Sequence, residues 1–269
     1  MRRSRLTAAL VTLALLLAPL ATARAGMADR VGATFALMSK DFVEAFKPIE
    51  GLVVSVEGVE IFLDVSDETG AQVGQEYTIF RKGETFVHPL TGRSLGRYEQ
   101  VLGYAQVVRL YPNFAAATFI AADEAPRPRA GDGARITRAR IRVAITPALD
   151  MTTAHPDLRR VPFLIAAALE GSRRFLATDP LSVSDRFASD SLRVEEMLAR
   201  PERAVRAARN LDVSGWVVPM VLERRGVTYL DVTYISAITG HALFSRRMPL
   251  VTPNAAEQQR FPWEPRPED

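Results

Sequence analysis

The chain changes character near residue 138, and this change constrains the fold more than any other feature. From residue 51 to 137, short apolar stretches alternate with turn residues such as Gly74 and Pro112-Asn113. Short strands at this spacing are typical of a small barrel or sandwich. After residue 138, stretches with helical spacing separate the strands, which indicates an α/β arrangement. We therefore predict an α+β protein with two domains.

The first of these, residues 51–138, is predicted to be a small all-β barrel or sandwich. A turn is expected at His88-Pro89-Leu90-Thr91-Gly92, because proline and glycine punctuate it. The predicted strands cover residues 53–56, 60–65, 77–80, 103–111, 114–121 and 134–137.

The second domain, residues 139–251, is predicted to be an α/β sandwich in the order β-α-β-α-β-β-β. Pro162 is well placed at the start of a helix, whose apolar face would extend to Phe175 and Leu176. Two shorter helices are expected at 191–199 and 201–210. Strands are predicted at 140–146, 181–184, 216–222, 227–235 and 242–248, the last three forming a meander.

Residues 26–50 are predicted to contain an amphipathic helix. Val31, Phe35, Met38, Phe42 and Phe46 follow one another at intervals of three or four, which places them on one helical face. Asp29 is the expected N-cap, and Pro48 is expected to end the helix. Two interpretations stay open: a helix packed on its own domain, or a helix that docks onto a partner.

The first 25 residues have the pattern of a secretory signal peptide. Arginine at positions 2, 3 and 5 is followed by an apolar run to residue 20 and by the small-residue site Ala23-Arg24-Ala25. The apolar run is shorter than the ~20 residues that a membrane anchor needs. We expect cleavage before Gly26.

Removal of this segment changes the charge of the protein. The chain has 34 basic and 31 acidic residues, and the signal holds four arginines and no acid, so the remainder has a net charge of −1. A basic patch for nucleic acid is therefore not expected. The chain has no cysteine, which leaves no residue for a lipid anchor or a disulfide. We predict a periplasmic protein of a Gram-negative cell that is not a lipoprotein, with outright secretion as the alternative.

Catalytic motifs are absent from the sequence. The three histidines, His88, His155 and His241, stand alone and lack zinc-binding spacing. No nucleophile elbow or phosphate-binding loop is present, and the lack of cysteine excludes a thiol nucleophile. We expect no enzymatic activity, no cofactor and no metal. The alternative is the loop that holds Asp150, His155 and Asp157, which could lie at the mouth of a cleft between the two domains.

A row of arginines is the strongest candidate for binding a partner. Arg200, Arg203, Arg206 and Arg209 recur every three residues, while apolar residues take the opposite side of the predicted helix. This pattern indicates an exposed stripe, either an ordinary solvated face or a docking site for an acidic protein surface or an anionic envelope polymer.

The last segment, residues 252–269, is rich in proline and lacks periodicity, so we expect disorder. Within it, Phe261-Pro262-Trp263 is either part of a solvated tail or a short linear contact for a partner.

Several short motifs of the chain resemble known families. In the first domain they are Gly51-Leu52-Val53-Val54, Glu57-Gly58-Val59, Val73-Gly74-Gln75-Glu76-Tyr77, Gly103-Tyr104-Ala105-Gln106-Val107-Val108 and Gly131-Asp132. In the second they are Arg142-Val143-Ala144-Ile145, Leu211-Asp212-Val213-Ser214-Gly215-Trp216-Val217-Val218 and Ser236-Ala237-Ile238-Thr239-Gly240. The first domain resembles the small β-domain of the flagellar assembly protein T family. The second resembles the α/β domain which that family shares with the Tol translocation protein N-terminus and the curli-secretion family.

The resemblance implies a non-enzymatic envelope protein that assembles or braces a larger machine, with the flagellar basal body as the candidate machine. The alternative is a periplasmic small-ligand-binding protein or hydrolase that uses the interdomain cleft.

Overall fold

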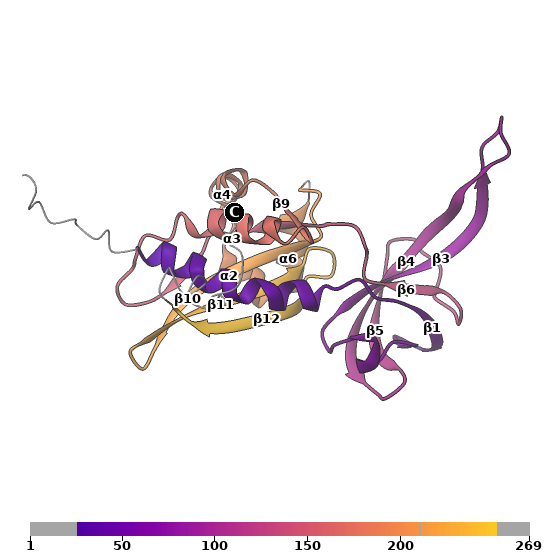
Figure 1. The fold of residues 1–269 in the computed structure, drawn as a ribbon, viewed down its shortest axis with the longest axis horizontal. Helices are drawn as coiled ribbons and strands as arrows, with labels where there is room; N and C mark the ends of the chain where they lie inside the picture. The colour runs from indigo at the N-terminus through magenta and orange to yellow at the C-terminus, as the bar shows by residue number, and fades with distance from the viewer. Residues whose placement is uncertain (1–25, 210, 252–269) are drawn as a thin grey trace, which may run out of the picture.

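The computed structural model describes residues 26–209 and 211–251. It contains helices and two β-sheets, so the predicted α+β class is confirmed. Figure 1 shows the two sheets side by side along the longest axis of the molecule. The predicted signal peptide and the predicted proline-rich tail lie outside the described residues.

The first sheet closes on itself, and we call it the closed sheet. Its six strands pair in the order β1-β2-β5-β4-β3-β6, with β6 also paired to β1. A core of fully buried side chains, including Ile61, Tyr77 and Leu102, fills its interior. The strands are β1 (Glu50–Glu57), β2 (Glu60–Leu63), β3 (Glu76–Val87), β4 (Ser94–Leu110), β5 (Ala115–Ala121) and β6 (Gly133–Arg135), with a 3-10 turn η1 (Asp67–Thr69) before β3.

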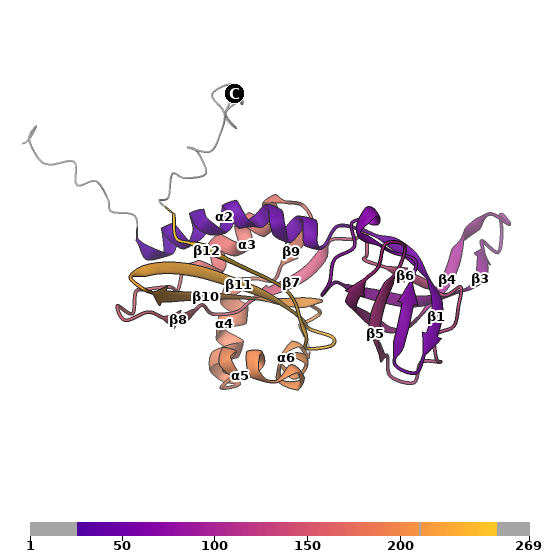
Figure 2. The same cartoon turned by 90° about the horizontal axis from the view of Figure 1, so that it is seen from below.

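The second sheet is open and has helices on both faces, as Figure 2 shows. Its strands follow the order β12-β11-β10-β7-β9, and β8 pairs with the far part of β10. The strands are β7 (Ile141–Ile145), β8 (Leu149–Met151), β9 (Phe175–Ala177), β10 (Gly215–Arg224), β11 (Val227–Ser236) and β12 (Ala242–Pro249). Helices α2 (Met27–Ala45) and α3 (Val161–Gly171) cover one face, and α4 (Pro180–Ser189), α5 (Val194–Ala199) and α6 (Pro201–Ala208) cover the other. The predicted meander at the end of the chain is confirmed.

Helix α2 packs on the open sheet and not on the closed sheet that follows it in the chain. Its apolar face is fully buried beside α3 and strands β10 to β12, and each large side chain contributes about 1.5–3 kcal/mol by leaving water. The face is therefore occupied, which leaves little of it for a partner. The helix begins after Gly26, whose backbone nitrogen donates to the Asp29 carboxylate, so the prediction of Asp29 as N-cap is wrong.

One strand of the second domain was predicted in the wrong place. Residues 181–184 belong to α4, which starts at Pro180 after Asp179 accepts hydrogen bonds from the backbone of Leu181 and Ser182. The strand is β9, whose Phe175 and Leu176 had been assigned to the preceding helix. Helix α3 ends at Gly171, and Arg173 adopts a positive φ of 58°, which no helix interior accommodates. Proline at the first helical position and an N-cap aspartate outweighed the local β-propensity.

In the described part of the chain, no helix combines the length and apolar character needed to cross a membrane.

Candidate functional site

Strands β3 and β4 continue as a two-stranded arm beyond the closed sheet. β3 pairs with β6 only as far as Phe80, and β4 pairs with β5 only from Gly103 onward. Between these points, residues 82–101 pair only with each other across the hairpin. Figure 1 shows this arm projecting from the closed sheet, away from the open sheet. The sequence predicted the turn at its tip correctly but missed the strands on either side.

The arm exposes large apolar side chains close together. Leu90 at the tip is 91 % exposed. The Phe86 and Tyr98 rings meet edge to face, with their centroids 6.4 Å apart. The ring pair lines an open concavity together with Glu84, Thr85 and Val87. Large apolar side chains that gather on an exposed element mark interaction sites in soluble proteins. The exposed apolar residues of the arm are Phe86, Val87, Leu90, Leu95, Tyr98 and Val101.

The arm is anchored firmly at its base. The Arg81 guanidinium donates two hydrogen bonds to the buried Asp132 carboxylate, at 2.8 and 2.7 Å, and one to the backbone oxygen of Arg127. Burial alone would raise the pKa of Asp132, but the hydrogen bonds from Arg81 and the Arg129 backbone lower it below its usual value. Because a bidentate pair fixes orientation as well as distance, the arm leaves the closed sheet in a defined direction.

Both long edges of the arm carry free backbone groups. A two-stranded ribbon satisfies only the inner groups of each strand, and within the described residues no third strand pairs with 82–101. Such edges are templates for an added strand, a common mode of peptide recognition. The arm therefore offers backbone hydrogen bonds and apolar side chains on the same element.

The junction between the two sheets is organised by one buried arginine. Arg174, just before β9, donates hydrogen bonds to the backbone oxygens of Phe46, Thr137 and Ala139 at 2.6–2.8 Å. Phe46 lies in the segment that enters the closed sheet, and the other two lie in the segment that leaves it. Burial lowers the pKa of Arg174. This single side chain thus links both segments that connect the two sheets to the start of β9 in the open sheet.

A half-buried carboxylate joins the sheets directly. Glu76, the first residue of β3, accepts hydrogen bonds from Ser236 Oγ at 3.1 Å and Thr239 Oγ1 at 2.6 Å. Ser236 is the last residue of β11, and Thr239 lies in the connection to β12. Burial raises the pKa of Glu76, and the two hydroxyl hydrogen bonds partly offset this. Gly74 is placed so that a Cβ would lie 2.7 Å from the Leu243 backbone oxygen, so only glycine allows this approach.

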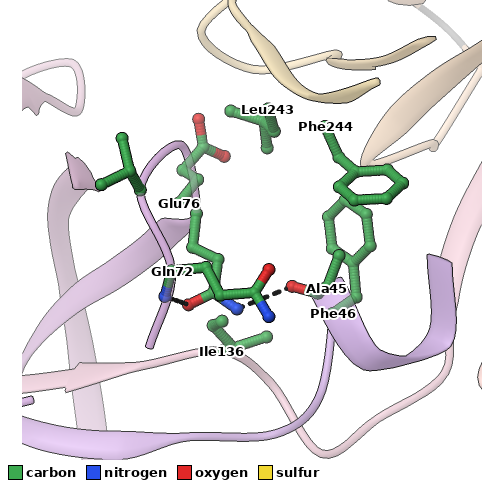
Figure 3. Close-up of a pocket in the computed structure, with 9 residues that line it drawn as sticks. Ala45, Phe46, Gln72, Glu76, Ile136, Leu243 and Phe244 are labelled. Atoms are coloured by element: carbon green, nitrogen blue, oxygen red, sulfur yellow. Dashed lines mark hydrogen bonds between the residues drawn. The ribbon is translucent and has the colours of Figure 1, made fainter. Parts of the chain in front are cut away.

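Two small cavities lie at the junction, among the described residues. Figure 3 shows Gln72, Glu76, Phe46 and Phe244 around one of these cavities. Its volume is about 20 Å³, and Gln75, which also lines it, donates to the Ala45 backbone oxygen at 2.8 Å. A neighbouring cavity has about 100 Å³. Small-molecule sites usually span about 300–1,000 Å³. Both cavities are smaller than this range, so these two cavities do not support the cleft that the small-ligand alternative assumes.

The loop with Asp150 and His155 lies away from the junction. Asp150 is opposite Val221 on β10, six residues beyond Gly215 at the junction end, a distance of about 20 Å along the strand. His155 Nδ1 lies 2.9 Å from Asp150 Oδ2, and Thr152 also donates to Asp150. Asp157 forms a separate fork with Arg159, which lowers the pKa of Asp157 to about 2. The expectation that this loop borders the interdomain cleft is wrong.

The four arginines of the predicted stripe do not share one helix. Helix α6 contains only Arg203 and Arg206, while Arg200 and Arg209 are the residues that flank it at either end. Arg203 is half-buried and lies 3.7 Å from the Glu196 carboxylate. Arg206 and the two flanking arginines are exposed. The cluster is basic, but less continuous than the spacing indicated.

The other two histidines occupy turns. His88 accepts hydrogen bonds from the backbone nitrogens of Leu90 and Thr91 through Nδ1, so it shapes the tip of the arm. His241 precedes β12. Among the described residues, no group of three or more metal-ligating side chains converges.

Sequence reasoning missed the arm because its strands are polar on much of their surface. Glycine at positions 83 and 96 and charges at Lys82, Glu84 and Arg97 weaken the alternating pattern. The available signal was the turn itself: a five-residue turn flanked by Phe86-Val87 and by Ser94-Leu95 predicts a hairpin.

Comparisons with known proteins add little to this description. The chain matches no protein-family model and no curated protein. Solved structures resemble it weakly. The LpoB C-terminal domain from Salmonella enterica matches at 14 % identity with a TM-score of 0.35, over 42 % of this chain and 84 % of that one. The same domain from Escherichia coli matches at 14 % identity with a TM-score of 0.36, over 43 % of this chain and 85 % of that one. Lipoprotein GNA1162 from Neisseria meningitidis matches at 12 % identity with a TM-score of 0.32, over 40 % of this chain and 81 % of that one. None of these descriptions mentions a flagellum.

The predicted localisation requires a correction. The sequence predicted a periplasmic protein that is not a lipoprotein, whereas a matched structure is that of a lipoprotein. The prediction rested on the absence of cysteine from this chain, and the match to a lipoprotein contradicts it. Attachment to a membrane is decided by the segment before the folded part, and here that segment lies outside the described residues.

Proposed function

We propose that this chain is a non-enzymatic interaction protein of the cell envelope, and that the arm of residues 82–101 binds its partner. The observation that carries the proposal is the arm itself: six large apolar side chains are exposed on a hairpin that is fixed at its base. Large apolar groups in water are unfavourable, by about 25 cal/mol per Å² of surface. A partner that covers them recovers this free energy.

The partner's surface is a protein strand or groove with an apolar centre. The free edges of the arm supply backbone donors and acceptors, and Phe86, Leu90 and Tyr98 supply side chains for pockets. Aromatic side chains at such positions commonly dominate binding energy. The arm carries three basic residues, Lys82, Arg93 and Arg97, and two acidic ones, Glu84 and Glu99, of which Glu99 already pairs with Arg135. The remaining excess of positive charge would be complemented by an acidic rim on the partner.

The resemblance to the flagellar assembly protein T family makes a basal-body component the first candidate partner. The exposed arginines around α6 are a second proposed contact, toward an acidic protein surface or an anionic envelope polymer. The arm takes precedence because its exposed groups are apolar, whereas arginines are well solvated without a partner.

Site-specific crosslinking in living cells tests the role of the arm. A photoreactive phenylalanine analogue at Leu90 should give a crosslinked product of discrete mass, and Phe86→Ser with Tyr98→Ser in the same chain should abolish it. The matched control places the same analogue at Val59, which is 70 % exposed in the turn between β1 and β2 of the same sheet. No product at Leu90, or an equal product at Val59, would rule out the arm as the binding element.

A further inference from the structure

A second apolar surface lies at the carboxyl ends of β7 and β9 in the open sheet. Strands β7 and β9 are parallel neighbours. β7 leads into α3 on one face of the sheet, while β9 leads into α4 on the other. Where adjacent parallel strands send their connections to opposite faces, a crevice opens at their carboxyl ends, and ligands of α/β proteins bind there.

The crevice is present as a groove of about 590 Å³. This is within the size range of binding sites for small molecules and short peptides, about 300–1,000 Å³. Phe163 of α3 and Leu181 of α4 line it and are 45 % and 57 % exposed. Its apolar lining consists of Pro147, Ala148, Pro156, Leu158, Pro162, Phe163 and Leu181.

The charges at the rim of the groove already have partners. Asp150 accepts from Thr152 and lies beside His155, and Asp157 is held in a fork by Arg159. An ionic ligand would therefore have to displace an existing pair. An occupant with aromatic and proline side chains needs no such exchange, because groove walls of proline and phenylalanine match it.

The chain carries such a segment within reach. Residues 252–269 include Phe261-Pro262-Trp263 and further prolines at 265 and 267. This tail leaves the fold at Val251, whose backbone nitrogen donates to Thr34 Oγ1 of α2 at 3.0 Å. Helix α2 packs closely on α3: Asp29 pairs with Arg160 at 3.2 Å, just before the groove residues Pro162 and Phe163.

The distance to be covered is short. The path from Val251 to the groove crosses α2 and α3, and packed helices lie about 8–10 Å apart, so it measures roughly 20 Å. The ten residues from Val251 to Phe261 can span up to about 33 Å. We propose that Phe261-Pro262-Trp263 of the chain's own tail occupies the groove between α3 and α4. This inference does not depend on the arm.

Tryptophan fluorescence of the full-length chain tests the proposal. The chain has two tryptophans, and Trp216 is fully buried with its Nε1 donating to the Ala204 backbone oxygen. The difference between the wild type and Trp263→Phe therefore isolates Trp263. We expect Trp263 to be shielded from acrylamide. Phe163→Ser combined with Leu181→Ser should raise its quenching constant severalfold. The control is Leu198→Ser with Val227→Ser, two exposed apolar residues outside the groove, which should leave it unchanged.

A second measurement separates docking from other causes of shielding. A synthetic peptide of residues 258–269 should bind the full chain carrying Phe261→Ala and Trp263→Ala, and bind the wild type far more weakly. Wild-type Trp263 as accessible as a free indole, or shielding that survives the groove substitutions, would overturn the proposal. Shielding that disappears on dilution would also overturn it, because the occupant would then be the tail of a second copy.

Discussion

The two ends of strand β3 lie in opposite environments. At its start, Glu76 is half-buried between the two sheets and hydrogen-bonded to Ser236 and Thr239. At its end, Phe86 and Val87 are exposed on an arm with which no third strand pairs in the described part of the chain. At the junction end, the Glu76 carboxylate has its hydrogen-bond partners, which serves stability. The arm end leaves apolar area and backbone groups unused, which serves binding.

This contrast predicts that substitutions at the junction change the unfolding free energy, whereas substitutions on the arm change attachment to a partner. Each of the following experiments tests one side of it.

Replacement of Arg174 by alanine should have the largest effect on stability. It removes a buried charged donor and leaves three backbone oxygens, of Phe46, Thr137 and Ala139, without their partner. We expect a loss of about 3 kcal/mol in unfolding free energy, measured by denaturant titration. Arg173→Ala, an exposed neighbour, should cost no more than about 0.5 kcal/mol. Equal effects of the two would show that the junction is not held by Arg174.

Glu76→Gln should give a smaller change that depends on pH. Because burial raises the pKa of Glu76 above 4.5, the folded state binds this proton more tightly than the unfolded state. The stabilising contribution of the protonated form is therefore complete at low pH and is lost as pH rises through the folded-state pKa. Glutamine is neutral throughout, so the variant should be more stable than the wild type at neutral pH, with the difference shrinking toward pH 4.5. The measurement is the unfolding free energy of both proteins between neutral pH and pH 4.5. A difference between variant and wild type that grows at low pH would contradict the prediction.

Phe86→Ser with Tyr98→Ser should leave stability nearly unchanged. Both rings are exposed, and their mutual contact is worth at most about 1 kcal/mol. The same variant should lose the crosslinked product expected at Leu90. A loss of stability as large as that of Arg174→Ala would mean that the arm supports the fold, which would erase the contrast.

The triple substitution Arg203→Gln, Arg206→Gln and Arg209→Gln should have the smallest effect on folding, within about 0.5 kcal/mol. Within residues 26–209 and 211–251, Arg203 is the one member of this group with a carboxylate partner, Glu196 at 3.7 Å. If these arginines contact an acidic surface, the substitution should weaken attachment, and added salt should do the same, since exposed charges are screened over about 10 Å at 0.1 M salt. Attachment that resists both changes would leave the arm as the remaining candidate.

The sequence by itself determined the class of the fold and much of its local structure. Intervals of three and four residues placed Val31, Phe35 and Phe42 on one buried helical face, and glycine and proline located the turn at the tip of the arm. These features follow from the backbone geometry of helices and turns, which depends on neighbours in the chain.

Only the tertiary structure decided what covers each face. Periodicity shows that α2 has an apolar side, but not that it packs on a sheet more than a hundred residues away. Periodicity also cannot show that Arg174 binds the two segments that connect the sheets. Nor can it show that, in the described part of the chain, no third strand pairs with residues 82–101. These features depend on contacts between segments far apart in the chain, and the local pattern of apolar and polar residues carries no record of which surfaces meet.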